Sequence, residues 1–262
     1  MLSERGNQTA ARGQVRPVCY RLCYQTRPPG RLVRVPPYGR SATIGRMAHP
    51  WPLFDLRIRT PRLELRAPTD DDLVALLDVA RRGVHDPELM PFAFAWTDLR
   101  APEFELSFLR FFWGTRASWA PAAWRLPLAV VHAGQPIGIQ EVWATNFTTL
   151  RVVETGSWLG LRQQRQGLGT EMRAGVLHLA FEGLGATAAL SGTLDGNEAS
   201  RRVSEKLGYE PNGEDMVAPR GSPLINHRYL LRRENWKRGL YPVSLEHLDA
   251  CLSMFGLPER RP

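Results

Sequence analysis

Apolar and polar residues alternate in the segment 58–66, and this two-residue period predicts a strand. Thr69 and Asp70 follow and are typical of a helix N-terminus, and the leucines beyond them recur at helical spacing. A second helix is predicted over about 102–119, where phenylalanines recur on one face and are interpreted as core residues. The folded part therefore begins with a strand and two helices.

Three strands joined by short turns are predicted next, and short turns favour antiparallel neighbours. These strands are the segments 125–132, 137–145 and 150–161. The pattern then alternates between helices and strands, with a helix over about Thr170–Leu184 ending at Gly185, a strand at 188–194, a helix at 197–208, a short strand at 209–213 and the last strand of the main sheet at 227–233. This order predicts a mixed α+β fold in one domain.

The C-terminal segment 241–262 carries a further apolar stripe, which predicts a helix with Ser244 as N-cap and Gly256 at its end. The stripe consists of Leu245, Leu248, Leu252 and Phe255. We expect this helical extension to pack on the domain, and a contact between two copies of the chain is the alternative.

Residues 1–46 show neither period and are rich in Pro, Gly and Arg, so they predict a disordered leader. The leader contains nine Arg and a single acidic residue, Glu4, whereas residues 47–262 contain 25 basic and 25 acidic residues. The net charge of +8 therefore belongs to the leader. Met47 directly precedes the first domain-like sequence and is a candidate for the true start; a nucleic-acid-binding arm or a targeting peptide is the alternative.

The three cysteines, Cys19, Cys23 and Cys251, are odd in number and lack the spacing of a metal site. We therefore expect no metal and a reducing compartment, most simply the cytoplasm. No stretch approaches the roughly 18 to 20 apolar residues that a membrane span needs, so no membrane partner is expected. The balanced charge of the folded part also argues against a nucleic-acid partner there.

The segment 162–170, RQQRQGLGT, joins a predicted strand to a predicted helix, a position where backbone amides and the helix dipole favour anionic oxygens. A nucleoside triphosphate loop would need lysine and then serine or threonine after its last glycine, but Thr170 follows Gly169 directly. A dinucleotide loop would need a third glycine where Met172 stands. The loop therefore predicts an anion site that fits neither of these ligand classes.

The pattern Gln164-x-x-Gly167-x-Gly169 resembles the pyrophosphate loop of the GNAT acyltransferase superfamily, which binds coenzyme A. The phrases TPRLELRAPTDDDL, ETGSWLGL and NEASRRVSEKLGY are similar to its RimJ/RimL-type branch, named for ribosomal-protein N-terminal acetyltransferases. This resemblance covers roughly residues 55–237. It implies the GNAT fold, a mixed and mostly antiparallel splayed sheet flanked by helices, over a domain at 47–240.

The same resemblance implies that acyl-CoA lies in an opening between the strands 150–161 and 188–194. Backbone groups of the first strand would bind pantetheine, and amides of the glycine loop would bind the pyrophosphate. The implied cofactor-binding residues are Trp158, Leu159, Leu161, Gln164, Arg165, Gln166, Gly167, Leu168, Gly169, Thr170, Asn197 and Ser200.

Direct attack of a neutral amine on the thioester is implied as well, with a base that removes the amine proton. Glu154 matches the family position of a carboxylate and is the predicted base; a structural role for Glu154, or Glu141 on the adjacent strand as the base, is the alternative. Ser204 stands where many members have a tyrosine acid, and it is a far weaker acid. We expect Ser204 only to hydrogen-bond the sulfur or relay a proton, or else to be helix surface, and Tyr209 to pack in the core.

The amine acceptor is expected to bind between the first two helices and the end of the strand 137–145. The candidate substrate-binding residues are His85, Asp86, Met90, Phe92, Trp96 and Asn146. Their apolar and aromatic content favours an acceptor with a hydrophobic side chain or a peptide end, without choosing among a small-molecule amine, a protein N-terminus and a lysine.

The sequence thus predicts an acyl-CoA-dependent N-acyltransferase, most simply an acetyltransferase. Succinyl-CoA is the alternative donor, because it would use the same CoA contacts. A CoA-binding regulatory module without catalysis is the alternative from another class, motivated by Ser204. Whether the protein forms a homo-oligomer is left open.

Overall fold

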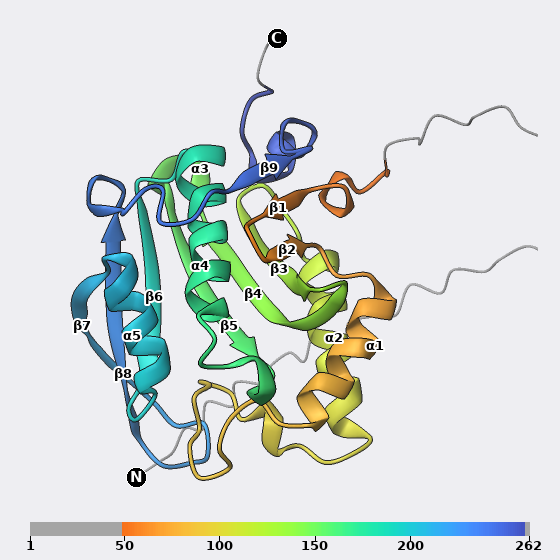
Figure 1. Ribbon diagram of the computed structural model, residues 1–262, viewed down its shortest axis with the longest axis vertical. Coiled ribbons are helices and arrows are strands. Elements are labelled where there is room, and N and C mark those ends of the chain that lie inside the picture. Colours follow the sequence, from red (N-terminus) through yellow and green to blue (C-terminus); the bar gives the residue numbers. More distant parts are fainter. Residues whose placement is uncertain (1–48, 260–262) are drawn as a thin grey trace, which may run out of the picture. The chain divides into compact units, whose positions relative to one another are not determined.

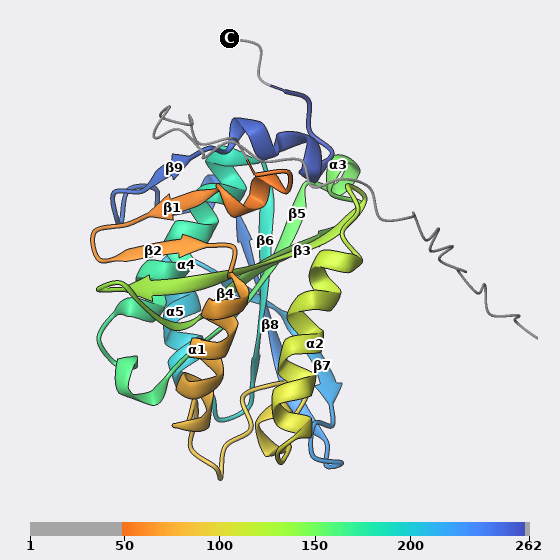
Figure 2. The ribbon, with the colours of Figure 1, turned by 90° about the vertical axis from the view of Figure 1, so that its right-hand side faces the viewer.

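The computed structural model describes residues 49–259, which form one mixed sheet with helices on both faces (Figure 1, Figure 2). The predicted leader 1–46 and the candidate start Met47 lie outside the described residues. The strands are β1 (Arg57–Arg59), β2 (Leu63–Arg66), β3 (Ala123–His132), β4 (Gln135–Thr145), β5 (Val152–Leu159), β6 (Ala188–Leu194), β7 (Glu210–Val217), β8 (Leu224–Arg232) and β9 (Ser244–Glu246). The helices are α1 (Asp70–Arg81), α2 (Glu103–Ala117), α3 (Phe147–Leu150), α4 (Leu168–His178) and α5 (Glu198–Leu207).

The sheet order is β7-β8-β6-β5-β4-β3-β2-β1-β9. Two buried clusters lie on its two faces. One joins α1 and α2 to the sheet through Leu76, Phe108 and Ile139, and the other joins α4 to the sheet through Met172 and Leu128. Side chains therefore alternate between these two cores along each central strand.

No helix in residues 49–259 is both long and apolar enough to cross a membrane.

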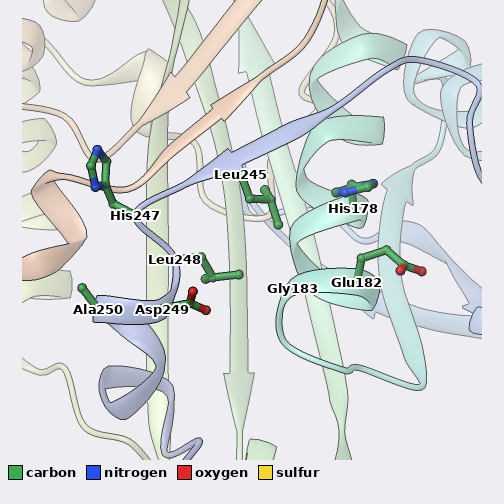
Figure 3. Close-up of a pocket in the computed structure, with 8 residues that line it drawn as sticks. All are labelled: His178, Glu182, Gly183, Leu245, His247, Leu248, Asp249 and Ala250. Atoms are coloured by element: carbon green, nitrogen blue, oxygen red, sulfur yellow. The ribbon is translucent and has the colours of Figure 1, made fainter. Parts of the chain in front are cut away.

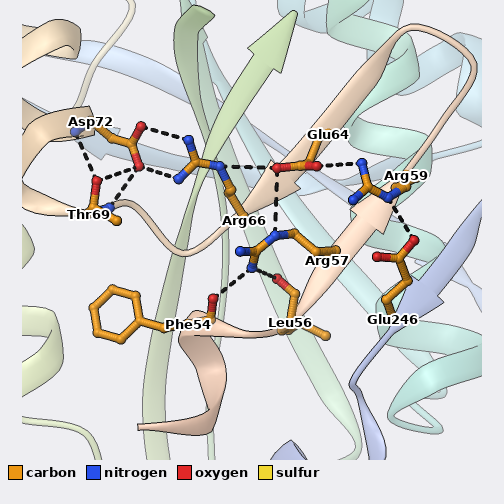
Figure 4. Close-up of polar contacts among 9 residues, drawn as sticks. All are labelled: Phe54, Leu56, Arg57, Arg59, Glu64, Arg66, Thr69, Asp72 and Glu246. Carbon is orange, nitrogen blue, oxygen red and sulfur yellow. Dashed lines mark hydrogen bonds and ion pairs between the residues drawn. The ribbon is translucent and has the colours of Figure 1, made fainter. Parts of the chain in front are cut away.

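The start of α1 is held by the contacts that its sequence predicts. Thr69 caps the helix, because its side chain accepts from the amide of Asp72 while the Asp72 carboxylate accepts from the amide of Thr69. Arg66 of β2 donates to the same carboxylate (Figure 4). Burial alone would raise the pKa of Asp72, but hydrogen bonds from Arg66 and Thr69 outweigh it and hold that pKa below its ordinary value.

The structure corrects two boundaries near the β9 edge. The predicted strand 58–66 is a hairpin of two strands, because the chain turns between Arg59 and Leu63 and the two halves pair antiparallel. The segment from Ser244 is not a helix: β9 pairs with β1, with Arg59 bonded to Glu246 across the pair (Figure 4). The strand 224–232 is therefore not the last strand of the sheet.

A 3₁₀-helix follows β9 at Asp249–Phe255. Its Cys251, Leu252 and Phe255 are buried in the core on the α4 face. Burial raises the pKa of the Cys251 thiol to about 12, so this thiol stays protonated at neutral pH.

The strand pair β5 and β6 opens partway along its length. These two strands run parallel and pair from Val152 with Ala188 to Thr155 with Ser191. Beyond that point both strands continue, but they no longer bond to each other. We call the opening the fork; α4 covers one side of it, and the α1 and α2 face of the sheet lies on the other side.

Candidate active site

A cavity of about 910 Å³ runs from the glycine loop through the fork to the aromatic residues between α1 and α2. It touches β4, β5, the loop 160–167, α4 and the start of α5. A second pocket, of about 500 Å³, is lined by residues 178–183, at and just after the end of α4, and by residues 245–250 (Figure 3). None of the site residues expected from the sequence lines this second pocket, so the first one is the candidate active site.

The glycine loop at one end of the cavity has a backbone that suits an anion. Gly167 is the N-cap of α4 and has a φ of +79°, a left-handed conformation that side chains with a Cβ rarely adopt. Arg165 is also left-handed, with a φ of +60°. The amides of the first turn of α4 have no acceptor within the helix, and Gly167, Gly169 and Thr170 line the cavity.

An ion pair behind the loop fixes its position. Glu171 is fully buried; its carboxylate accepts from Thr60 Oγ1 at 2.7 Å and pairs with Arg62 at 2.7 Å. Arg62 also donates to the carbonyl oxygen of Gln166 at 3.0 Å. Burial alone would raise the pKa of Glu171, but the hydrogen bonds from Thr60 and Arg62 lower it below its ordinary value.

Gln164, the first residue of the loop motif, turns its side chain toward the protein. Its amide Nε2 donates to the carbonyl oxygens of Val84 at 2.8 Å and Leu159 at 2.9 Å. The Gln164 side chain therefore joins the end of β5 to the segment after α1, and it holds the loop and the acceptor side of the cavity together.

The twelve predicted cofactor-binding residues divide into two groups. The cavity is lined by Trp158, Leu159, Leu161, Gln164, Arg165, Gly167, Gly169, Thr170, Asn197 and Ser200. Gln166 and Leu168 do not line it: Gln166 Nε2 donates to the carbonyl of Arg162, and Leu168 is buried in the core. Asn197 caps α5 because its Oδ1 accepts from the amide of Ser200, and the Ser200 hydroxyl accepts from Thr193 Oγ1.

Glu141 of β4 lines the cavity at the fork. Its side chain is only 16% exposed and pairs with Arg125 at 3.3 Å, while Oε1 is buried and has no hydrogen-bond partner in the described part of the chain. Burial raises the pKa of Glu141 to about 7, and Arg125 only partly offsets the rise. A methyl group added to Gly156 would lie 4.0 Å from Glu141 Oε2, so this carboxylate stands beside the fork.

Glu154 lies on the same face of the sheet but does not line the cavity. Its side chain is 41% exposed, and its carboxylate lies 3.7 Å from the guanidinium of Arg228. Ser204 does not line the cavity either: it is fully buried, and its Oγ has no hydrogen-bond partner within residues 49–259. Tyr209 is buried in the core, as expected, and its hydroxyl lies 3.3 Å from Thr155 Oγ1.

Aromatic rings form the opposite end of the cavity. Trp96 packs against Phe92, Phe108 and Trp158, with ring centroids 5.4 to 5.9 Å apart. His85 lies against Phe92, and its Nε2 is 2.7 Å from Thr97 Oγ1. This end of the cavity suits an apolar group.

Among the predicted substrate-binding residues, the structure brings His85, Asp86, Phe92 and Trp96 to the cavity. Met90 is buried and does not line it. Asn146 does not line it because it lies at the far end of β4, where it precedes α3.

A buried polar cluster on the α4 side of the fork escapes the sequence patterns. Arg173 of α4 is 3% exposed and lines the cavity. It donates to Gln140, Ser157 and Ser191. In the sequence, Arg173 directly follows Met172, a residue of the buried helix face. Helical periodicity alone assigns a charged residue at this position to the exposed face, so it does not indicate that Arg173 is buried.

No group of three or more side chains that could hold a metal ion occurs in residues 49–259. The cavity therefore offers backbone amides at one end, a buried carboxylate and a buried guanidinium at the fork, and aromatic rings at the other end.

Comparison with protein families gives a match to the acetyltransferase (GNAT) domain over residues 62–210. This range runs from β2 to the first residue of β7 and includes the loop, the fork and both carboxylates.

Three solved structures have a similar fold at low sequence identity. Mycobacterium smegmatis RimJ in complex with CoA-disulfide has a TM-score of 0.59 and 17% identity, over 76% of this chain and 94% of that one. A putative ribosomal-protein-serine acetyltransferase from Vibrio cholerae has a TM-score of 0.53 and 22% identity, over 68% and 98%. RimL, the ribosomal L7/L12 alpha-N-protein acetyltransferase, in complex with CoA has a TM-score of 0.52 and 16% identity, over 66% and 95%.

Proposed function

The chain belongs to the acetyltransferase (GNAT) family, and we propose that it transfers an acetyl or other short acyl group from acyl-CoA to a primary amine, with Glu141 as the base. The observation that carries the proposal is the continuous cavity, which joins the glycine loop to the fork and the fork to an aromatic pocket. Two of the structures with this fold contain CoA, which supports the donor class.

The residues at the loop end fit the phosphates and the pantetheine arm of CoA. The left-handed Gly167 has no atom closer than 3.5 Å to an added Cβ, so an oxygen can approach the loop amides there. Beyond Thr155, β5 no longer bonds to β6, so amides of a ligand could pair with this edge of β5. Bound acyl-CoA would supply a thioester carbonyl carbon for attack and a thiolate as leaving group.

Glu141 has the environment that a base at neutral pH needs. An alkylamine with a pKa near 10.4 is mostly protonated at pH 7, so a group that accepts its proton assists the attack. The pKa of about 7 lets Glu141 be ionised at physiological pH and still bind a proton well. The Glu141 carboxylate, whose Oε2 stands beside the fork, is the group that we expect to take the proton. Glu154, predicted first, is better explained by its contact with Arg228.

The acceptor is proposed to be a primary amine next to an apolar group, such as a protein N-terminus. Aromatic rings at the end of the cavity favour burial of an apolar side chain near the amine. Two of the similar structures carry names of ribosomal-protein acetyltransferases, which supports a protein acceptor. A small-molecule amine and a lysine side chain are also primary amines, and both are included as acceptors in the test.

Release of free thiol tests the proposal. Acetyl-CoA and succinyl-CoA are each offered with a panel of apolar amines, peptides with apolar N-termini and a lysine peptide. We expect turnover with at least one pair, and the Glu141→Gln variant should bind the donor normally but turn over far more slowly. Binding of the donors without turnover for any amine would favour a regulatory CoA-binding module instead.

A further inference from the structure

The buried arginine at the fork has no carboxylate to balance its charge. Arg173 lies 3.1 Å from Ser191 Oγ, 3.2 Å from Ser157 Oγ and 3.4 Å from Gln140 Oε1, and none of the ion pairs in residues 49–259 includes it. Burial of an unpaired cation is costly. Its three acceptors are neutral, and so is the hydroxyl of Tyr209, which also contacts Arg173. The positive charge therefore remains available to whatever occupies the cavity that Arg173 lines.

Arg173 contacts both strands of the fork. Ser157 belongs to β5 and Ser191 to β6, so the guanidinium bridges the strands where their pairing has just ended at Thr155. Gln140 is oriented by its own donor group, because Nε2 donates to the carbonyl of Gly156 at 2.9 Å. Its Oε1 is thereby turned toward Arg173.

The two charged groups of the fork lie on opposite faces of the sheet. Glu141 pairs with Gly156 on the α1 and α2 face, whereas Gln140, Ser157 and Arg173 belong to the α4 face. An amine that approaches from the aromatic pocket meets the carboxylate first. A negative charge that develops on the other side of the reacting carbon meets the guanidinium.

Given the proposed function, on which this inference rests, we infer that Arg173 stabilises the negative charge on the leaving sulfur of CoA. As the C–N bond forms and the C–S bond breaks, the bonding electron pair passes to sulfur and the amine proton passes to Glu141, so charge and atoms balance. Ser204 cannot serve as the acid here, because it is buried and does not line the cavity. A fixed cation removes the need for an acid, because a thiolate beside a guanidinium can leave without taking a proton.

Binding of free CoA tests this role apart from turnover. The full chain is titrated calorimetrically with CoA and with desulfo-CoA, in which hydrogen replaces the thiol, at pH 6.5 and pH 8.5. The ratio of the two affinities isolates the thiol, because titration of a nearby group such as Glu141 cancels where it affects both ligands equally. Since a charged hydrogen bond favours the thiolate, this ratio should rise about tenfold between the two pH values.

Variants identify the group responsible. In Arg173→Gln the ratio should stay flat with pH, and in Arg173→Lys, which keeps the charge, part of the rise should return. Arg165→Gln is the matched control: it removes one positive charge from the cavity wall, so it should weaken both ligands equally and leave the rise in the ratio intact.

Two results would overturn the inference while leaving the proposed function standing: a flat ratio in the unmodified chain, or an unchanged rise in Arg173→Gln. A loss of discrimination between succinyl-CoA and acetyl-CoA in Arg173→Gln, with the thiol ratio unchanged, would assign Arg173 to an acyl carboxylate and also overturn it. Failure of both CoA and desulfo-CoA to bind the unmodified chain would instead contradict the proposed function, and this inference with it.

Discussion

The two ends of the cavity are built from different kinds of group. The loop end consists of consecutive backbone amides at the start of α4, held from behind by Glu171 and Arg62. The acceptor end consists of side chains from separate elements, such as Glu141 of β4, Arg125 of β3 and the rings between α1 and α2. The loop end is a local structure with a general affinity for anions, whereas the acceptor end exists only when distant segments pack together.

This contrast predicts that changes at the acceptor end affect the rate of the reaction, whereas changes at the loop end affect donor binding. Glu141→Gln removes the proton acceptor but keeps the size of the side chain. We expect kcat to fall by roughly 10²- to 10⁴-fold, the range for loss of a general base, with little change in the affinity for acyl-CoA. Steady-state kinetics and calorimetry measure the two quantities.

Glu154→Gln is the control for this change, because Glu154 is half exposed and lies outside the cavity lining. Its kcat should remain within a few-fold of the unmodified protein. An equal loss in both variants would break the assignment of the base to Glu141.

At the loop end, Gly167→Asp should weaken acetyl-CoA binding by at least about tenfold, since a carboxylate repels the pyrophosphate and a Cβ strains the left-handed backbone. Gly185→Asp introduces the same strain at a φ of +72°, with no atom within 4 Å of an added Cβ and away from the cavity. Calorimetry should find normal acetyl-CoA affinity in Gly185→Asp, and equal affinity in the two variants would rule out our placement of the pyrophosphate.

The loop support can be weakened without touching the cavity lining. Glu171→Gln breaks a pair in which the carboxylate is fully buried and Arg62 is 42% exposed, and we expect a loss of about 2 kcal/mol in the free energy of unfolding. Because the folded-state pKa of Glu171 is lowered, this contribution is present above the unfolded-state pKa and is lost as pH falls through the folded-state value. Denaturation measurements at pH 7 and pH 3.5 should therefore show a smaller difference in the free energy of unfolding between the unmodified protein and Glu171→Gln at the lower pH.

Glu141 should have the opposite dependence on pH. Its pKa is raised to about 7, so its contribution to stability is fully present below the unfolded-state pKa and is lost as pH rises through 7. The free energy of unfolding of Glu141→Gln, relative to that of the unmodified protein, should therefore rise by up to about 3 kcal/mol between pH 4 and pH 9. Parallel denaturation curves over this range, with a constant difference, would show that the carboxylate is not desolvated in the folded protein.

A smaller effect is expected from the aromatic wall. Phe92→Ala removes a ring that packs on Trp96 and His85, and it should raise the KM of an apolar acceptor by about tenfold, the effect of losing roughly 1 to 2 kcal/mol of apolar contact. Donor affinity should not change. If donor affinity falls as far as acceptor affinity, the two ends of the cavity are coupled rather than separate.

The same contrast explains what the sequence could predict. The sheet with flanking helices, the strand order around the loop and the GNAT resemblance are confirmed, because each depends on a local pattern. The hairpin of β1 and β2 and the strand β9 were not predicted, since three- and four-residue strands form only against a partner. Alternation places Glu141 and Glu154 on one face, but it does not indicate which of the two carboxylates is buried by tertiary packing. The burial of Arg173 likewise depends on tertiary packing, so the sequence pattern does not predict it.

The central claim is that the loop and the fork form an acyl-CoA site, and calorimetric titration of the full chain with acetyl-CoA, succinyl-CoA and free CoA at pH 7.5 tests it most directly. The account predicts saturable one-to-one binding that survives Glu141→Gln and is weakened by Gly167→Asp but not by Gly185→Asp. The absence of binding for all three ligands would contradict it.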